Sequence, residues 1–209
     1  MSAEYLSGTQ GSLRGILFLL SGPAGSGKST LLRRALNEDI NLTFSISCTT
    51  RSPREGETDG IHYHFLSDEE FSKRVENNEF LEHAKVHNWR YGTLANTVID
   101  ILNDGKDVIM DIDVQGADQV RDSEDPVISD ALVDIFLTTS DTAELEKRLI
   151  GRGSEDEDTF QLRMRTAADE IKRWQDYTYC IVSGDHEEDF RSLSSIIATE
   201  RLRVSRMLP

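Results

Sequence analysis

A glycine-rich stretch at residues 22–30 constrains the fold of this chain more than any other part of the sequence. It reads GPAGSGKST and matches the phosphate-binding pattern G-x-x-x-x-G-K-[ST]. The preceding residues 15–21 form a short apolar run, typical of a buried strand, and the apolar residues after the motif recur at helical spacing. Because this motif binds phosphate where it joins a strand to a helix, the sequence predicts a P-loop here.

The predicted P-loop offers three kinds of phosphate ligand. Its glycines place no side chains in the way, so successive backbone N–H groups can point at phosphate oxygens from the N-terminus of a helix. We expect Lys28 to reach the β- and γ-phosphates and the Ser29 hydroxyl to bind Mg²⁺. The nucleotide-binding set comprises the whole motif: Gly22, Pro23, Ala24, Gly25, Ser26, Gly27, Lys28, Ser29 and Thr30.

The chain is strongly acidic, with a formal net charge of −15 at pH 7. Such a surface repels nucleic acid, so a nucleic-acid partner is not expected and the phosphate site must be a local basic pocket. No apolar run approaches the roughly 20 residues of a membrane span, and residues 1–12 lack the order of a signal peptide. Cys48 and Cys180 form no C-x-x-C pair. We therefore expect a cytoplasmic protein with no membrane partner.

Apolar strands alternate with helical patterns along most of the chain, which predicts an α/β fold with a three-layer core around a parallel sheet. Residues 47–92 break this alternation and are expected to form a smaller inserted lobe. Residues 1–13 are expected to be a disordered tail before a single domain, 14–209. Within that domain the expected divisions are a core of residues 14–46, 93–140 and 163–209, the lobe 47–92, and a helical lid 141–162.

The local patterns also predict individual elements. Strands are expected at residues 42–48, 61–65, 80–86, 107–111, 132–137 and 179–182. Capping signals predict helices that begin at Ser67, Thr93 and Asp141, the second of them ending at Gly105. A long helix is expected over residues 156–177 and a last helix from about Glu187.

Asp111 ends an apolar strand and is the expected partner of the P-loop. A carboxylate at that position can orient a water molecule on Mg²⁺ opposite Ser29. Asp113 follows two residues later, so both carboxylates point to the same side of an extended chain. The alternative is that both acids simply leave the strand for solvent.

Three arginines are candidates for stabilising a transferring phosphoryl group. Arg148 and Arg152 share one helix face, Gly151 and Gly153 flank the second of them, and Arg163 follows on the next helix. Spacing alone leaves solvated arginines equally open. Phosphoryl transfer needs cations beyond the P-loop lysine, so the glycine-flanked pair is a candidate for a lid that excludes water.

A second group of residues could bind a second phosphate. Arg51 and Arg54 lie in an expected loop, and Tyr63 and Tyr91 flank the predicted lobe. Two arginines three residues apart can bind a phosphate through bidentate contacts. Glu82 would match a ligand with two adjacent N–H donors, because a buried carboxylate is costly unless paired. Taken alone, the two tyrosines are better interpreted as packing residues.

Together, seven segments resemble the guanylate kinase family. They read SGPAGSGKST, SISCTTRSPREGE, GIHYHF, NNEFLEHA, YGT, DIDVQG and RLIGRG, and the similarity covers the chain from about Arg14 onward. The resemblance implies a P-loop core sheet with a separate GMP-binding lobe and a lid. It also implies that ATP, held by the P-loop, phosphorylates GMP to GDP with Mg²⁺ as the cofactor.

The resemblance further implies roles for individual positions. The GMP-binding set, in which the arginines and tyrosines hold the phosphate and Ser47, Glu82 and Thr93 read the guanine, is Ser47, Arg51, Arg54, Tyr63, Glu82, Tyr91, Thr93 and Asp113. The catalytic set of cations is Lys28, Arg51, Arg148, Arg152 and Arg163. The metal set is Ser29 and, through water, Asp111.

Some positions depart from the family pattern or remain undecided. Cys48 stands where a serine is common, and Thr93 stands where some members have serine, which keeps the hydroxyl. Ser183 stands where an asparagine often contacts the adenine edge. Arg165 is a rival of Arg163 for the third cation, and the sequence does not decide between them.

Three other functions are weighed against GMP phosphorylation. A kinase for a different nucleoside monophosphate is the main alternative. A non-catalytic guanylate-kinase-like binding domain typically lacks P-loop or lid residues, whereas Lys28, Ser29 and the lid arginines are present here. A GTPase switch fits less well, because the sequence contains no N-K-x-D motif. The sequence gives no indication of the oligomeric state.

Overall fold

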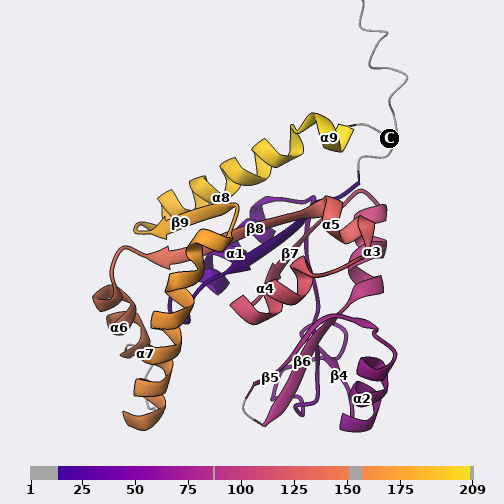
Figure 1. Cartoon of the computed structure of the whole chain (residues 1–209), viewed down its shortest axis with the longest axis horizontal. Coiled ribbons are helices and arrows are strands. Elements are labelled where there is room, and N and C mark those ends of the chain that lie inside the picture. Colours follow the sequence, from indigo (N-terminus) through magenta and orange to yellow (C-terminus); the bar gives the residue numbers. More distant parts are fainter. Residues whose placement is uncertain (1–13, 87, 151–156, 208–209) are drawn as a thin grey trace, which may run out of the picture.

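The computed structural model describes residues 14–86, 88–150 and 157–207 (Figure 1). Its core is a parallel sheet of five strands in the order β2-β7-β1-β8-β9. The strands are β1 (Leu17–Ser21), β2 (Leu42–Phe44), β7 (Asp107–Asp111), β8 (Leu132–Thr139) and β9 (Tyr179–Ser183). The predicted α/β fold class is confirmed, while the expected tail, residues 1–13, lies outside the described residues.

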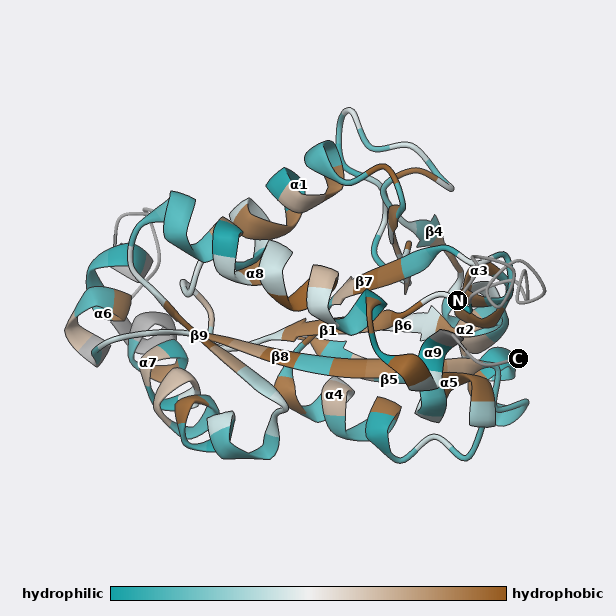
Figure 2. Ribbon diagram, turned by 90° about the horizontal axis from the view of Figure 1, so that it is seen from above, coloured by the Kyte–Doolittle hydropathy of each residue, from teal (hydrophilic) through white to brown (hydrophobic). Residues whose placement is uncertain are grey.

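The central strand β1 is buried on both faces, which is why it reads as a continuous apolar run. Ile16, Phe18 and Leu20 pack with α1 and α8, and Leu17 and Leu19 pack with α3, α4 and α5. Figure 2 shows α1 and α8 on one side of the core sheet and α4 and α5 on the other. The helices are α1 (Lys28–Glu38), α3 (Ala95–Asn103), α4 (Val114–Arg121), α5 (Pro126–Ala131), α8 (His186–Arg201) and the short α9 (Val204–Met207).

A second sheet, in the order β4-β3-β6-β5, forms a small lobe with one helix. Its elements are β3 (Cys48–Thr49), β4 (His64–Phe65), α2 (Asp68–Glu76), β5 (Phe80–Val86) and β6 (Trp89–Leu94). Phe71 of α2 stacks on Phe80 with ring centroids 4.4 Å apart, which joins the helix to the sheet. In Figure 1 this lobe lies at the lower right, below the core sheet.

Two helices lie at the lower left in Figure 1: α6 (Thr142–Ile150) and α7 (Glu157–Ile171). Leu145 of α6 and Ala167 of α7 are buried together in a small cluster of their own. A 3-10 helix, η2 (Lys172–Asp176), follows α7. The boundary expected between lid and core, after residue 162, falls inside the continuous helix α7. Among the described residues, the structure contains no helix with the length and apolarity that a membrane crossing needs.

The expected single strand at residues 42–48 is wrong. β2 ends at Phe44 in the core sheet, and β3 begins at Cys48 in the lobe. The backbone N–H of Ser45 still donates to the carbonyl of Ile109 in β7 at 3.3 Å, after which the chain leaves the core sheet. Only residues 45–47 link the two strands, so one extended run serves two sheets.

Other local expectations also need correction. The strand expected at residues 61–65 is reduced to β4, because the N–H groups of Ile61 and His62 fold into a turn on the carbonyl of Thr58. Thr93 does not cap α3; Leu94 occupies that position, and the Thr93 hydroxyl bonds to Glu82 instead. The long helix ends at Ile171 and continues as η2.

Two of the predicted helix caps are confirmed. The capping box at Ser67 is complete, since its hydroxyl accepts from the N–H of Glu70 while the Glu70 carboxylate accepts from the N–H of Ser67. The Asp141 carboxylate accepts from the N–H of Glu144 at 2.7 Å at the start of α6.

Candidate active site

The P-loop lies between β1 and α1, as the sequence predicts. Gly22 and Gly27 have φ values of +139° and +106°, which side-chain-bearing residues rarely adopt. A Cβ at Gly22 would lie 2.0 Å from the carbonyl oxygen of Leu137, so the loop can approach β8 only with glycine there. Gly27 occupies the N-cap position of α1. Having no side chain to cap the helix, Gly27 leaves the helix N-terminus open to an anion.

Lys28 and Ser29 begin α1 and face the end of β7. The Lys28 ammonium donates to the carbonyl oxygens of Gly22 at 2.5 Å and Pro23 at 3.2 Å. The Ser29 hydroxyl donates to Oδ2 of Asp111 at 3.3 Å. These contacts bring the predicted phosphate-binding lysine and the predicted metal pair together at one end of the core sheet.

Asp111 and Asp113 present their carboxylates at this same edge. Surrounding protein atoms raise the pKa of Asp111 by desolvation, and Lys28 and the Ser29 hydroxyl lower it, although solvent still reaches the side chain. Asp113 caps α4 by accepting from the N–H of Gly116 at 2.8 Å. A hydroxyl and a carboxylate are donors that Mg²⁺ prefers, with phosphate oxygens and water as further ligands. The described residues hold no cluster of three or more acidic, histidine or cysteine ligands, so an ion here would need the nucleotide.

A pocket of about 340 Å³ lies between the P-loop and α7. From α7 it is lined by Arg163, Thr166 and Glu170, and from the core by Lys28 and Asp113, among others. Of the two rival arginines, Arg163 lines this pocket and Arg165 is exposed outside its described lining.

Sequence reasoning missed Glu170. Burial raises the pKa of Glu170, while Lys28 lowers it and Asp113 adds to the rise. Glu170 lies seven residues after Arg163 on α7, so both reach the pocket from one helix face. The seven-residue spacing from Arg163 could have indicated a shared helix face, but only the structure shows that this face lines the P-loop pocket.

Arg148 already contacts the P-loop. Its Nη1 donates to the carbonyl of Ser26 at 3.3 Å and to the Ser183 hydroxyl at 3.1 Å, and its Nε donates to Glu144 at 3.0 Å. The Ser183 hydroxyl donates in turn to Asp189 of α8 at 2.7 Å. The other predicted lid arginine, residue 152, lies outside the described part of the chain.

A second pocket, of about 270 Å³, lies between the lobe and the core. Its lining includes most of the residues predicted to bind GMP: Ser47, Tyr63, Glu82, Tyr91 and Asp113. Asp111, Ile112 and Asp113 line this pocket and the P-loop pocket alike. Ligands in the two pockets would therefore face each other across the end of β7.

Glu82 lies at the centre of a hydrogen-bonded group in the second pocket. β5 and β6 pair Glu82 with Thr93, whose hydroxyl donates to Oε1 of Glu82 at 2.7 Å. The Ser47 hydroxyl lies 3.3 Å from that of Thr93. Burial raises the pKa of Glu82, and the hydrogen bond from Thr93 opposes the rise. The carboxylate is thus fixed in place but keeps acceptor capacity for a ligand.

The predicted phosphate-binding residues lie beside this group. Tyr63 and Tyr91 meet edge to face with ring centroids 6.0 Å apart, and the Arg51 guanidinium carbon lies 5.5 Å from the Tyr63 ring. Arg51 is nearly buried and paired with Glu57, a residue that sequence reasoning did not single out. The Arg54 side chain is exposed and lies outside the described pocket lining.

Comparisons with known proteins agree with this arrangement. The guanylate kinase family model matches residues 14–200. The guanylate kinase of Campylobacter jejuni (strain NCTC 11168) is 42% identical over 192 residues, covering 91% of each chain. That of Histophilus somni is 45% identical over 195 residues, covering 92% of this chain and 91% of its own.

A solved structure is similar as well. The crystal structure of guanylate kinase from Anaplasma phagocytophilum superposes with a TM-score of 0.70 at 30% sequence identity, covering 93% of this chain and 90% of its own. The family model spans the P-loop, the lobe and both pockets. The chain therefore belongs to the guanylate kinase family.

Proposed function

We propose that this protein transfers the γ-phosphoryl group of ATP to GMP, giving ADP and GDP. The observation that carries the proposal is the pair of pockets that share Asp111, Ile112 and Asp113. One opens onto a P-loop, and the other is lined by Ser47 and by Glu82, whose carboxylate accepts from the buried Thr93 hydroxyl. Two nucleotides bound in this way would bring donor and acceptor phosphates together at the end of β7.

ATP would bind in the P-loop pocket. The backbone N–H groups of residues 22–30 and the Lys28 ammonium would hold its β- and γ-phosphates. Mg²⁺ would be held by the Ser29 hydroxyl and, through water, by Asp111, and it would neutralise charge on the β- and γ-phosphate oxygens. Ser183, where the family often has asparagine, bonds to Arg148 and Asp189, so any contact it makes to adenine would be through this fixed hydroxyl.

GMP would bind in the lobe, residues 47–92. Arg51, Arg54, Tyr63 and Tyr91 would hold its phosphate, and Glu82 with its hydroxyl partners would bind guanine. A phosphate monoester has a second pKa of about 6, so the attacking oxygen of GMP is already deprotonated at pH 7. The site therefore needs positioning and positive charge rather than a general base.

Phosphoryl transfer forms a bond between an oxygen of the GMP phosphate and the γ-phosphorus and breaks the bond to the β-phosphate oxygen, which leaves with ADP. Charge on the transferring group would be stabilised by Lys28, by Arg51 on the GMP side, and by the arginines of the lid, residues 141–162, and of α7. The arginines of the lid are Arg148 and Arg152, and that of α7 is Arg163. The proposal places the enzyme in the cytoplasm, in keeping with its two free cysteines. It includes no nucleic-acid partner, because the net charge of −15 disfavours nucleic-acid binding.

The direct test is to measure ADP formation from ATP with each of the four common nucleoside monophosphates. We expect activity with GMP to exceed that with AMP, CMP and UMP by orders of magnitude, because only guanine offers two adjacent donors to Glu82. Comparable rates with another monophosphate would support the alternative function, a kinase for a different nucleoside monophosphate. No turnover with any of them, together with tight binding of a protein ligand, would support a non-catalytic domain.

Binding of both substrates is expected to draw the lobe onto the core and to close the lid, whose Arg148 contacts the P-loop in this structure, over the bound substrates. Two anionic substrates must meet in a site from which water is excluded, inside a protein whose net charge repels them. Small-angle scattering with GMP and a non-hydrolysable ATP analogue should give a smaller radius of gyration than either ligand alone. If the radius stays unchanged with both sites full, the closure is refuted.

A further inference from the structure

The guanidinium of Arg51 is held by a carboxylate of its own loop. Nη1 of Arg51 donates to Oε2 of Glu57 at 2.9 Å, and Nη2 donates to Oε1 at 2.8 Å. Nη1 also donates to the carbonyl of Ser52 at 2.8 Å. Both partners are shielded, with side-chain exposures of 10% for Arg51 and 18% for Glu57. A bidentate pair of this geometry fixes the orientation of the guanidinium.

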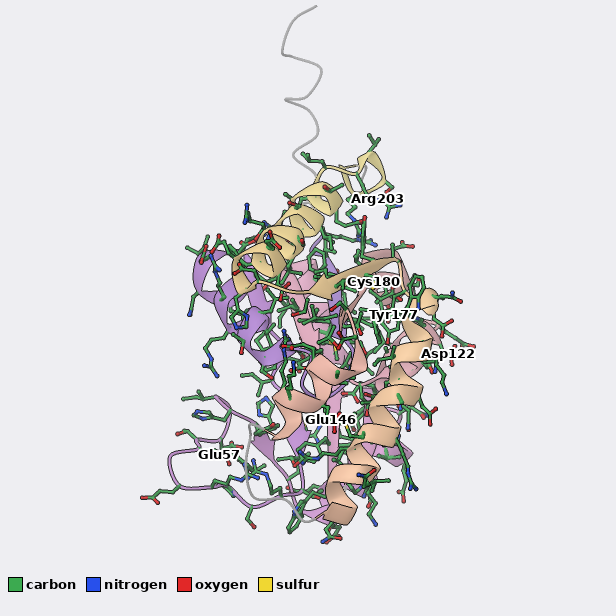
Figure 3. All side chains as sticks on the ribbon, turned by 90° about the vertical axis from the view of Figure 1, so that its left-hand side faces the viewer. Glu57, Asp122, Glu146, Tyr177, Cys180 and Arg203 are labelled. Atoms are coloured by element: carbon green, nitrogen blue, oxygen red, sulfur yellow. The ribbon has the colours of Figure 1, made fainter. Side chains whose placement is uncertain are left out.

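Glu57 also organises the second arginine of the loop. The same Oε2 accepts from the backbone N–H of Arg54 at 2.7 Å. The hydrogen bonds from Arg51 and from the Arg54 backbone lower the pKa of Glu57 to about 2, so the carboxylate stays charged at neutral pH. Figure 3 shows Glu57 on the lobe, at the end of the molecule opposite Arg203. One carboxylate thus ties together both arginines proposed to hold a phosphate.

The geometry of the pair decides which part of Arg51 remains for a ligand. A guanidinium has five N–H groups, and Glu57 and Ser52 take three of them, all on the two terminal nitrogens. The Nε–H and the second N–H of Nη2 lie along the other edge of the plane, and Arg51 also has a side-chain hydrogen bond with Tyr91, itself a proposed phosphate-binding residue. That edge matches a phosphate in a bidentate contact. The guanidinium carbon lies over the rings of Tyr63 and Phe65, 5.5 and 5.9 Å from their centroids, so both rings pack against the guanidinium.

We propose that Glu57 is a positioning residue for the acceptor phosphate, turning the Nε–Nη2 edge of Arg51 toward GMP. The proposal rests on the proposed function of the lobe. In the opposite role, Glu57 would compete with GMP by occupying the place of its phosphate. The contacts favour positioning, because Glu57 takes the end of the guanidinium and does not occupy its side edge. The two roles predict opposite changes in GMP affinity.

The test is calorimetric binding of GMP and of guanosine, which lacks the phosphate, to the wild type, Glu57→Gln and Glu55→Gln. Glu55 lies in the same loop with an exposed side chain, so it controls for the charge change. We expect Glu57→Gln to weaken GMP binding roughly tenfold or more, because an amide donor now faces an arginine donor. Guanosine affinity should stay unchanged, and Glu55→Gln should bind both ligands like the wild type.

Steady-state kinetics give an independent readout. Glu57→Gln should raise the KM for GMP and leave the KM for ATP at the wild-type value. Should Glu57→Gln fail to fold, as judged by circular dichroism, Glu57→Asp replaces it. Its side chain is one methylene shorter, so the carboxylate keeps its charge but is drawn back from the terminal nitrogens of Arg51, and GMP affinity should again fall.

Three results would overturn the proposal. In the first, Glu57→Gln binds GMP as tightly as Glu55→Gln does. In the second, Glu57→Gln binds GMP more tightly than the wild type. In the third, Glu57→Gln loses affinity for GMP and for guanosine in equal proportion, as a general structural defect would cause. Failure of the proposed function looks different. In that case the wild type itself would bind GMP no more tightly than guanosine or AMP.

Discussion

The wild-type enzyme is expected to use GMP with a kcat/KM at least roughly 10³ above that for AMP, and Glu82→Ala should lose most of this preference. Guanine presents its N1–H and its N2 amino group side by side, and one carboxylate can accept both. Adenine presents an acceptor at N1 and nothing at position 2, so it would set a lone pair against Glu82. Sites that leave buried polar groups unpaired with the wrong ligand discriminate by about 10⁴-fold.

The structure strengthens this expectation because the Glu82 carboxylate is already fixed. Thr93 donates to one of its oxygens at 2.7 Å, so little ordering remains to be done when the base arrives. Glu82→Gln should be intermediate, since its amide keeps one acceptor but turns a donor toward a donor. Glu76→Ala, the same truncation at an exposed position of the lobe, is the control and should keep the wild-type ratio.

The measurement is kcat/KM for GMP and for AMP with each variant, at saturating ATP. An unchanged ratio in Glu82→Ala would remove Glu82 from base recognition. Comparable use of AMP by the wild type would instead contradict the assignment of the lobe to guanine.

Lys28→Met is expected to lower kcat by on the order of 10²-fold or more, the usual effect of removing one preorganised charge from a transition state. Methionine has a similar length but carries no charge. The Lys28 ammonium donates to the carbonyls of Gly22 and Pro23 in its own loop. The charge is therefore held within the P-loop.

The variant should still fold, because Lys28 lies at a helix start and outside the two apolar clusters of the core. A thermal melt by circular dichroism checks this, and single-turnover kinetics measures the chemical step. Lys106→Met, at an exposed position, is the control and should turn over like the wild type. Near-normal turnover in Lys28→Met would disprove the role assigned to the P-loop lysine.

Features set by short stretches of sequence were predictable. The P-loop depends on glycines at backbone angles that other residues avoid, and the apolar run before it depends on burial on both faces of one sheet. The capping box at Ser67 is closed within four residues. The glycine angles and the capping box are decided by neighbours in the chain, and an apolar run indicates burial on both faces whichever elements cover it, so the pattern and the structure coincide.

Features that depend on distant partners were not predictable. Thr93 looks like a helix cap, but β5 places Glu82 beside it and the hydroxyl bonds there instead. Glu170 reads as one acid among many on a helix until α7 packs beside the P-loop. Arg148 reaches Ser26 across 122 positions of sequence. In each case the backbone pattern was correct or nearly so, and the side chain found a partner that the local sequence could not reveal.

The short connections between lobe and core limit how the two can move. Residues 45–47 are all that separates β2 from β3, and β6 ends at Leu94 immediately before α3 begins at Ala95. A tether of three residues reaches at most about 10 Å when fully extended, so the lobe cannot slide away from the core. Its available motion is rotation about a line through these two junctions. Ser47 belongs to the first tether, so the proposed base-binding end of the lobe stays near the axis while Arg51 and Glu57, farther along the loop, sweep the larger arc.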